Sequence, residues 1–310
     1  LYENRGALAR RGFLLLDNVG SPNNIDIPAF FTKDFAGTFS RWLSVRGIET
    51  VEEKDAFFRH KPLLPLISRQ IDEAPKSAHT VVLTSEHFSS GLGRAEDISS
   101  FASWCHEVFE SVTVVCFVRH HQARAPSAWS TAVRNGSKLS SRKFIQRWTK
   151  APSNNPWHLA NQWQSAFSRD ELAFHAYPEA EQWDICFEFS RRYLGSSDRA
   201  ELVYGSKRKN RSFSRVQIEI LRKLNVVPPH SRRTKAIRRL LVDPLFRAVS
   251  RLALNTQRRS VKFSRQERGA LEMTLGEDSA QFARVFLSPE ERDRFCVSSH
   301  QRRRNTRTVS

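Results

Sequence analysis

The chain has 310 residues, of which 39% are hydrophobic and 11% aromatic. This length and composition suit one large domain or two small ones with a packed core, and they exclude an intrinsically disordered chain. No apolar run approaches the roughly 18 residues of a membrane-spanning helix, so we expect no transmembrane segment. The net charge of +18, from 50 Lys and Arg against 32 Asp and Glu, favours anionic partners: nucleotides, nucleic acid, acidic glycans or a lipid surface.

The four cysteines stand far apart, without a Cys-x-x-Cys pair: Cys105, Cys116, Cys186 and Cys296. This spacing favours free thiols in a reducing compartment over disulfides or a metal site. We therefore expect a cytoplasmic protein that binds no metal.

The two ends of the chain differ in character. The opening Leu1–Arg5 has no signal-peptide features and suggests a fragment or a processed chain. Much of the excess positive charge lies in Ser206–Arg239 and in Gln301–Arg307. We expect residues 297–310 to form a basic, disordered tail.

Short apolar runs between turn residues predict four strands. They are Gly12–Leu16, Thr80–Ser85, Val112–Val118 and Glu171–Tyr177. Continuous apolar runs suit strands that are covered on both faces, as in a parallel sheet. Helical patterns are expected at Ala95–Phe109, Ser127–Val133, Leu159–Phe167 and Trp183–Leu194. Alternating strands and helices predict an α/β fold with a mainly parallel sheet flanked by helices.

The chain after Gly195 reads as entirely helical, with helices at Arg215–Leu224, Thr234–Ala253 and Ser264–Phe286. These final helices are too amphipathic to stand alone. We therefore predict a single domain over residues 1–296 with a helical C-terminal part.

The third predicted strand delivers Arg119 at its C-terminal end, and Ser127 follows eight residues later near a predicted helix start. Ligands of α/β sheets bind at the carboxyl ends of strands. An Arg fork and a Ser hydroxyl near a helix N-terminus can hold a phosphate. An arginine in this position is equally often a surface ion-pair residue.

The second strand ends in Thr84-Ser85-Glu86-His87, at the sheet edge where Arg119 is also expected. Glu86 or His87 could act there as a base near a bound phosphate. The alternative is a helix start, with Thr84 or Ser85 as the cap.

A basic loop at Gly205–Ser214 contains Asn210 and Ser212, which offer amide and hydroxyl donors to an anion. The simpler interpretation is a helix start that is capped by Ser212 or Ser214.

In combination these segments resemble the PAPS-dependent sulfotransferases, in particular bacterial carbohydrate-modifying members. Arg119 with Ser127 is similar to the family's 3′-phosphate-binding segment, and Thr84–Glu86 is similar to a Ser-Ser-Glu segment of bacterial members. Asn210–Ser212 followed by Leu221–Asn225 resembles the family's "N-x-S … L-x-x-x-N" helix. Further matches occur in the expected order at Gln162-Trp163, Tyr177, Phe189–Gly195, Asp278–Arg284 and Phe295.

The resemblance implies a P-loop-type fold and transfer of a sulfuryl group from PAPS to an acceptor hydroxyl or amine, on a carbohydrate or a small molecule. Arg119 and Ser127 would contact the 3′-phosphate of the donor nucleotide, and Asn210 and Ser212 would also bind the donor. The family's catalytic residue stands at the second strand end, which implies Glu86 as the base with His87 as the alternative.

One departure from the family concerns the N-terminal part. Asn4–Leu14 resembles the segment that follows the family's phosphosulfate-binding loop, so the chain is expected to start inside a helix, without the first strand and that loop. None of the 12 glycines lies in a phosphate-cradling loop with a neighbouring Lys and Ser. This chain is therefore expected to be inactive without the missing part.

Two rival functions follow from the same observations. The departure favours a non-catalytic remnant or binding domain. The charge favours a basic nucleic-acid-binding protein, although the chain has no RNP, KH or zinc-finger signature, so nucleic acid is the less expected partner.

Overall fold

The computed structural model describes residues 4–20, 24–33, 39–177, 185–195, 213–225 and 261–296. The chain divides into two compact units. The first unit comprises the described parts of 1–115, 158–173 and 180–206, and the second those of 116–157, 174–179 and 207–310. The single domain over residues 1–296 stays a prediction.

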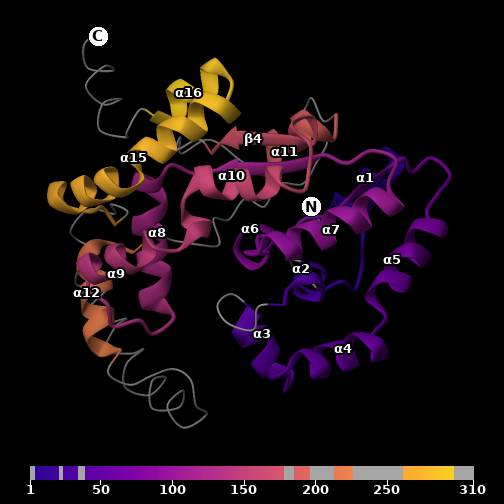
Figure 1. The fold of residues 1–310 in the computed structure, drawn as a ribbon, viewed down its shortest axis with the longest axis horizontal. Helices are drawn as coiled ribbons and strands as arrows, with labels where there is room; N and C mark the ends of the chain where they lie inside the picture. The colour runs from indigo at the N-terminus through magenta and orange to yellow at the C-terminus, as the bar shows by residue number, and fades with distance from the viewer. Residues whose placement is uncertain are drawn as a thin grey trace. The chain divides into compact units, whose positions relative to one another are not determined.

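The described elements make a mixed, mostly helical α/β protein (Figure 1). In chain order they are α1 (Arg5–Arg10), β1 (Phe13–Leu15), α2 (Asp26–Phe31), α3 (Ser40–Val45), α4 (Val51–His60), α5 (Leu63–Asp72), β2 (Thr80–Val82), α6 (Phe88–Gly91), α7 (Ala95–Val108), β3 (Val114–Val118), α8 (His121–Arg134), α9 (Ser141–Trp148), η3 (Pro152–Asn154), α10 (Pro156–Gln164), η4 (Arg169–Glu171), β4 (Leu172–Ala176), α11 (Ile185–Tyr193), α12 (Arg215–Leu224), α15 (Arg265–Phe286) and α16 (Pro289–Cys296). The predicted α/β class is confirmed.

All four predicted strands are present, each slightly shorter than its apolar run. β1 and β2 pair in parallel, with Phe13 opposite Thr80 and Leu15 opposite Val82. β3 pairs with β4, so the described strands form two separate two-stranded sheets rather than the single expected sheet. Local apolar runs predict where strands lie. Which strands pair depends on tertiary packing, about which the runs carry no information.

The strand pair β1–β2 packs into a core of Leu8, Phe13, Leu15, Val82 and Leu194 in the first unit. The chain enters β1 through Gly12, whose φ is +86°, a conformation that favours glycine. A Cβ at this position would lie 2.4 Å from the His79 ring. The tight turn between α1 and β1 therefore depends on the absence of a side chain.

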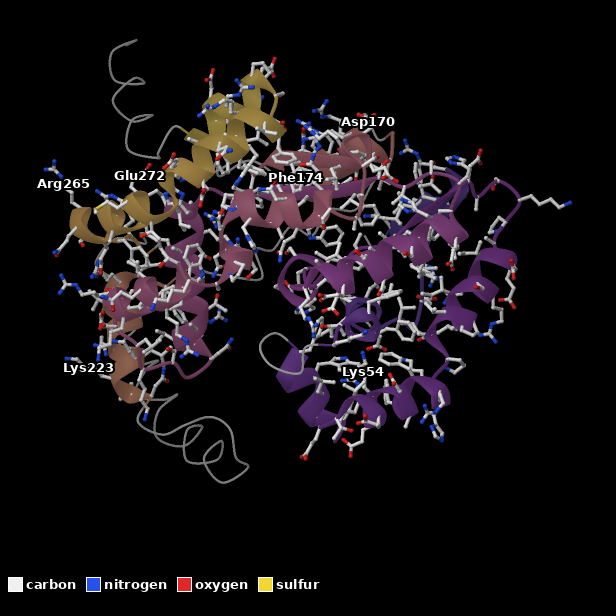
Figure 2. The ribbon with its side chains drawn as sticks, in the orientation of Figure 1. Lys54, Asp170, Phe174, Lys223, Arg265 and Glu272 are labelled. Carbon is white, nitrogen blue, oxygen red and sulfur yellow. The ribbon has the colours of Figure 1, made fainter. Side chains whose placement is uncertain are left out.

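The first unit also buries charged groups, and each has polar partners. Asp26 is fully buried and accepts from Trp42 Nε1 at 3.1 Å and from Lys61 Nζ at 2.5 Å. Lys54, labelled in Figure 2, donates to the carbonyl oxygens of Phe30, at 3.0 Å, and of Thr32. Burial lowers the pKa of Lys54. These bonds offset the lost hydration that would otherwise make the burial costly.

The core of the second unit lies among α8, α9, α12 and α15, and the helix pairs α8–α9 and α8–α12 are in contact (Figure 1). α8 contributes Ala125, Trp129 and Val133, which recur every four residues and are fully buried. This spacing puts all three on one face of the helix.

The helix predicted at Ser127–Val133 is longer than expected. α8 begins at His121 because His120 caps it, its Nδ1 accepting from the Gln122 N–H at 3.3 Å. Pro126 lies inside the helix, where it removes one backbone hydrogen bond without ending it.

The other predicted helices are confirmed where the structure describes them. α12 has the predicted bounds, α7 ends one residue early, and Ser264 caps α15. The predicted helix Thr234–Ala253 lies outside the described residues. Of the short helices α2 to α6, α9 and α16, none was predicted.

Glu267 ties three helices of the second unit together. Its carboxylate accepts from both terminal nitrogens of Arg215 in α12, at 2.8 and 3.0 Å, and from the Ser141 hydroxyl in α9. It also completes the capping box of α15 with Ser264. Burial acts to raise the pKa of Glu267, but these hydrogen bonds outweigh it and lower the pKa to about 2.

We expect Glu267→Gln to lower the free energy of unfolding by about 2 kcal/mol, since it removes charge-assisted bonds to Arg215. The folded pKa lies below the ordinary value, so this stabilisation is present above pH 4.5 and is lost as the pH falls towards 2. Urea unfolding at several pH values measures both effects. A variant with unchanged stability at pH 7 would contradict the assignment, and Glu290→Gln, at an exposed pair with Arg294, serves as control.

Candidate functional site

The candidate site is the junction between β3 and α8 in the second unit. Arg119 follows Val118, the last residue of β3, and α8 begins two residues later. The backbone N–H of Tyr177 donates to Val118 O at 2.8 Å, and the guanidinium carbon of Arg119 lies 5.6 Å from the centre of the Tyr177 ring. The Nε of Arg119 is buried and has no hydrogen-bond partner among the described residues. The junction therefore holds a cation with an unused donor.

The first turn of α8 is fixed to α15 by a buried imidazole. His121 is 1% exposed, and its ring nitrogens lie 2.8 Å from Ser279 Oγ and 3.1 Å from Glu272 Oε2. Because the Glu272 carboxylate can only accept, Nε2 of His121 carries the hydrogen and the Ser279 hydroxyl donates to Nδ1. Gln122 Nε2 also donates to Glu272, at 2.9 Å. Each ring nitrogen of His121 is thus satisfied in the neutral form.

His120, directly after Arg119, is held neutral by its surroundings. Burial, and then the neighbouring His121, lower its pKa to about 3, against the opposing effect of Glu272. Its ring lies 4.0 Å from that of His121 and 5.1 Å from that of Phe295. At neutral pH the positive charge next to the strand end is therefore that of Arg119.

Ser127 does not lie at the helix start as predicted. It is the seventh residue of α8 and is exposed, because the cap at His120 starts the helix six residues earlier than the sequence pattern indicates. Ser127 therefore lies on the same helix as the junction, one turn beyond its first residues.

The second strand end lies in the first unit. The Glu86 side chain is 75% exposed, and its Oε1 is 3.5 Å from His87 Nε2. The Ser85 hydroxyl accepts from the His87 N–H at 3.2 Å, which shapes the turn into α6. The cap of α6 is His87 itself, so neither Thr84 nor Ser85 caps that helix as the alternative interpretation held.

Glu86 belongs to the first unit, and Arg119 with Ser127 to the second. Asn210 and Ser212 lie outside the described residues. Ser214 is the cap of α12, its hydroxyl accepting from the Gln217 N–H at 3.3 Å, as one interpretation of the basic loop predicted.

Sequence reasoning missed Arg124, which projects from the first turns of α8. Its Nη1 donates to Ser153 O at 3.1 Å, and its guanidinium lies 5.8 Å from the centre of the Trp148 ring. Burial raises the pKa of the nearby Cys116 thiol to about 11, although Arg124 partly opposes this. The predicted free thiol is thus unreactive. The sequence offered no signal for Arg124, because the cap His120 is not of a residue type that predicts a helix start.

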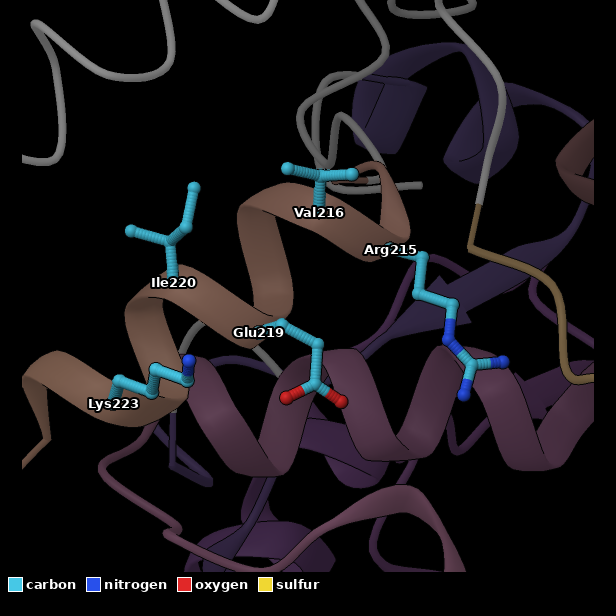
Figure 3. A pocket seen from close by; sticks show the side chains of 5 residues that line it. All are labelled: Arg215, Val216, Glu219, Ile220 and Lys223. Carbon is cyan, nitrogen blue, oxygen red and sulfur yellow. The ribbon is translucent and has the colours of Figure 1, made fainter.

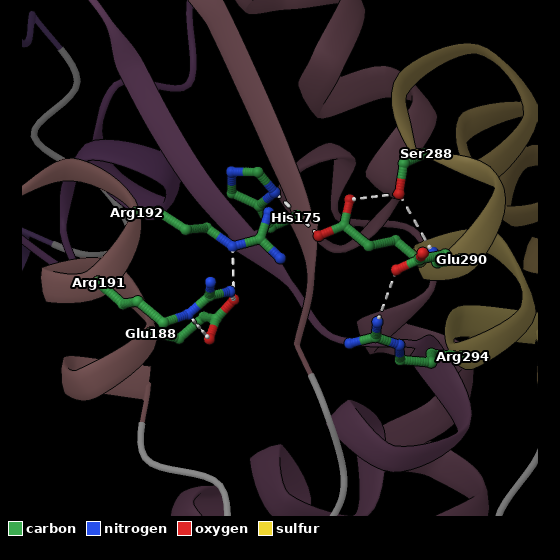
Figure 4. A network of polar contacts seen from close by, with 8 residues as sticks. His175, Glu188, Arg191, Arg192, Ser288, Glu290 and Arg294 are labelled. Carbon is green, nitrogen blue, oxygen red and sulfur yellow. Dashed lines mark hydrogen bonds and ion pairs between the residues drawn. The ribbon is translucent and has the colours of Figure 1, made fainter. Parts of the chain in front are cut away.

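Other polar clusters have structural explanations. His175 of β4, labelled in Figure 4, has its Nδ1 2.9 Å from a carboxylate oxygen of Glu291. The backbone N–H of Glu291 donates to the Ser288 hydroxyl at the start of α16. Figure 4 also shows Glu188 of α11 accepting from Arg191 and Arg192 in its own helix. Such pairs stabilise helix ends and surfaces.

A pocket lies along α12 (Figure 3). It is lined by Arg215, Val216, Glu219, Ile220 and Lys223. All five belong to one helix, so no groups converge there from separate elements, as catalysis requires.

Within the described ranges, no group of three or more His, Cys, Asp or Glu side chains is placed to hold a metal ion. None of the helices in those ranges has the length and apolar character to cross a membrane. Comparisons with protein-family models, with curated proteins and with solved structures found no match. A functional assignment therefore depends on the residues of the chain itself.

We expect His120→Asn to flatten the loss of stability in mild acid. Asn retains the helix cap but removes the imidazole. The folded pKa of His120 is lowered, so the wild type loses stability as the pH falls from about 6.5 towards 3, where only the unfolded chain binds the proton. Chemical unfolding between pH 7 and about 5.5 measures this slope before most carboxylates titrate. His60→Asn, at an exposed helix end, is the control, and an equal slope in wild type and His120→Asn would contradict the assignment.

Proposed function

We propose that the protein is a PAPS-dependent sulfotransferase of P-loop-type fold, and that the β3–α8 junction binds the 3′-phosphate of the donor nucleotide. The observation that carries the proposal is the buried Nε of Arg119, which has no hydrogen-bond partner among the described residues. Most buried donors are satisfied, and for a donor at a strand end an acceptor from a bound ligand would supply the partner that the described residues do not. A phosphate oxygen would supply that acceptor.

The surroundings of Arg119 favour an anion. The residue lies at the carboxyl end of β3 and at the N-terminal, partially positive end of α8. The His120 ring is neutral, so it does not repel the Arg119 guanidinium. Its Nδ1 accepts from the Gln122 N–H at the start of α8, so it does not compete with a phosphate for the donors of Arg119. Ser127, exposed one turn beyond the junction, offers a hydroxyl to the same ligand.

In the proposed reaction the acceptor oxygen or nitrogen forms a bond to the sulfur of PAPS. The bond between sulfur and the bridging phosphate oxygen breaks, and adenosine 3′,5′-bisphosphate leaves with that electron pair. Glu86 takes the proton of the acceptor. Its exposed carboxylate is accessible to an acceptor, and the His87 ring beside it orients it. Alignment of the reactants supplies much of the rate, as in phosphoryl transfer.

The acceptor in this proposal is a hydroxyl or amine on a carbohydrate. Asn210 and Ser212 are proposed as further donor contacts. These assignments depend on the resemblance of the sequence segments alone.

We expect Arg119→Ala to weaken binding of adenosine 3′,5′-bisphosphate by roughly 10-fold to 100-fold. The substitution removes charge-assisted hydrogen bonds that contribute about 1.5–3 kcal/mol. Isothermal titration calorimetry with the purified chain measures the change. Arg265→Ala, at an exposed arginine of the same unit, is the matched control and should bind like the wild type. Equal affinity for Arg119→Ala and the wild type would remove Arg119 from the site.

We expect Glu86→Gln to lower turnover by about 100-fold or more in a preparation that transfers sulfate, because the amide has the same shape but cannot accept the proton. Donor binding should persist. His87→Gln should have a much smaller effect, since it leaves the carboxylate in place. Transfer of radiolabelled sulfate measures turnover. Loss of activity in His87→Gln with a normal Glu86→Gln enzyme would reverse the assignment.

A further inference from the structure

The second unit carries a set of exposed cations that follow one another along the chain, and we call this set the basic strip. No Asp or Glu occurs between Glu110 and Asp170, a stretch that contains nine Arg and Lys residues. The strip comprises Arg134, Lys138, Arg142, Lys143, Arg147 and Lys150, all exposed. It runs from the end of α8 through the connecting segment and along α9.

α9 presents these cations on one face because its other face is buried. Phe144, Ile145 and Trp148 pack into the core of the unit. At 100° per residue, Arg142, Lys143 and Arg147 lie within an arc of roughly 140° and extend over about 8 Å of the helix. The charges therefore point outward from a rigid, well-anchored helix.

None of the six cations forms an ion pair with another residue of the described ranges. Two acids of the described part of this unit, Glu267 and Glu219, already have polar partners. Glu267 holds Arg215 and Ser141, and Glu219 lies 2.7 Å from Arg222 of its own helix. The described residues therefore do not neutralise the positive charge of the strip.

The strip continues a face of α8 that also holds Ser127. Ser127, Thr131 and Arg134 are exposed and follow one another at steps of four and three residues, which puts them on one side of the helix. Arg134 lies about 10 Å along the helix from Ser127. A ligand on the strip would thus approach the proposed donor site.

The exposed and the buried side chains of the strip indicate which kind of anion it binds. Exposed cations that follow one another along α9 suit a linear polyanion with closely spaced charges. The aromatic rings of α9, Phe144 and Trp148, are buried, so they offer no surface on which unpaired bases could stack. The apolar face is buried as well, so α9 cannot insert into a bilayer.

We propose that the basic strip binds an acidic polysaccharide and that this polyanion is the acceptor glycan of the proposed sulfotransferase. The acceptor role rests on the proposed function, whereas the binding itself depends only on the strip.

The test combines Arg142→Gln, Lys143→Gln, Arg147→Gln and Lys150→Gln in one variant, with a sulfated oligosaccharide of defined length as the probe. We expect the affinity to fall at least 10-fold at about 0.1 M salt. The slope of log affinity against log salt should shrink by roughly 3, since each lost contact with a single-stranded polyanion removes about 0.7. An unchanged melting temperature would establish that the variant is folded.

The matched control changes four exposed cations outside the strip that form no ion pair with described residues: Arg59→Gln, Lys76→Gln, Lys262→Gln and Arg265→Gln. It alters the net charge equally and should bind the oligosaccharide within about three-fold of the wild type. An equal loss in this control would overturn the proposal, because net charge alone would then explain binding. Tighter binding of a single-stranded oligonucleotide or of anionic vesicles, lost in the strip variant, would also overturn it.

Nucleotide binding separates the strip from the donor site. The strip variant should bind adenosine 3′,5′-bisphosphate like the wild type, and Arg119→Ala should bind the oligosaccharide like the wild type. Strip-dependent oligosaccharide binding without any nucleotide binding would refute the proposed function and support the glycan-binding strip. Normal nucleotide binding without strip-dependent oligosaccharide binding would refute the strip alone.

Discussion

The buried imidazole of His121 fixes the first turn of α8, next to which Arg119 lies. Its two ring nitrogens are 2.8 Å from Ser279 Oγ and 3.1 Å from Glu272 Oε2, both on α15. Loss of either partner would leave a buried polar atom unsatisfied, at a cost of about 1–3 kcal/mol. Because Arg119 stands two residues before His121, the bond pair that anchors α8 also sets where the end of β3 delivers its guanidinium.

The same anchor constrains the charge of the junction. The His120 and His121 rings are 4.0 Å apart, so protonation of both would place two buried positive charges in contact. Burial lowers the pKa of each ring, and the hydrogen bonds of His121 suit the neutral form. The protein therefore separates two tasks among three consecutive residues. The imidazoles cap and anchor the helix, and Arg119 alone carries charge.

The sequence predicted the strands well because their apolar runs are local signals. The bounds of α12 were also predictable, since Ser214 and Gln217 form a capping box that can be recognised from residue types. The start of α8 was not, because His120 is a cap outside the usual Ser, Thr, Asp and Asn. The pairing of β1 with β2 and of β3 with β4 depends on contacts between distant segments, which no local pattern encodes.

For the candidate site, the sequence could name residue types but not their environments. Arg119 was identified from its place at a strand end, whereas the burial of its Nε is a property of the packed structure. Glu86 was identified in the same way, and its high exposure could not be anticipated. Ser127 was predicted near the helix start because the cap at His120 was not recognised. The helix begins six residues earlier, at His121, so Ser127 lies within α8 and not at its start.

The two anion-binding surfaces proposed for the second unit differ physically. Arg119 is partly buried and donates from a nitrogen without solvent contact, so its interaction with a phosphate depends on direct hydrogen bonds and is weakly screened. The cations of the basic strip are exposed, and their attraction for a polyanion arises largely from counterion release. Rising salt should therefore release a polyanion from the strip well before it releases a nucleotide from the junction. Among the described residues, Glu267 is paired with Arg215 and Ser141 and Glu219 with Arg222, so neither acid neutralises the strip.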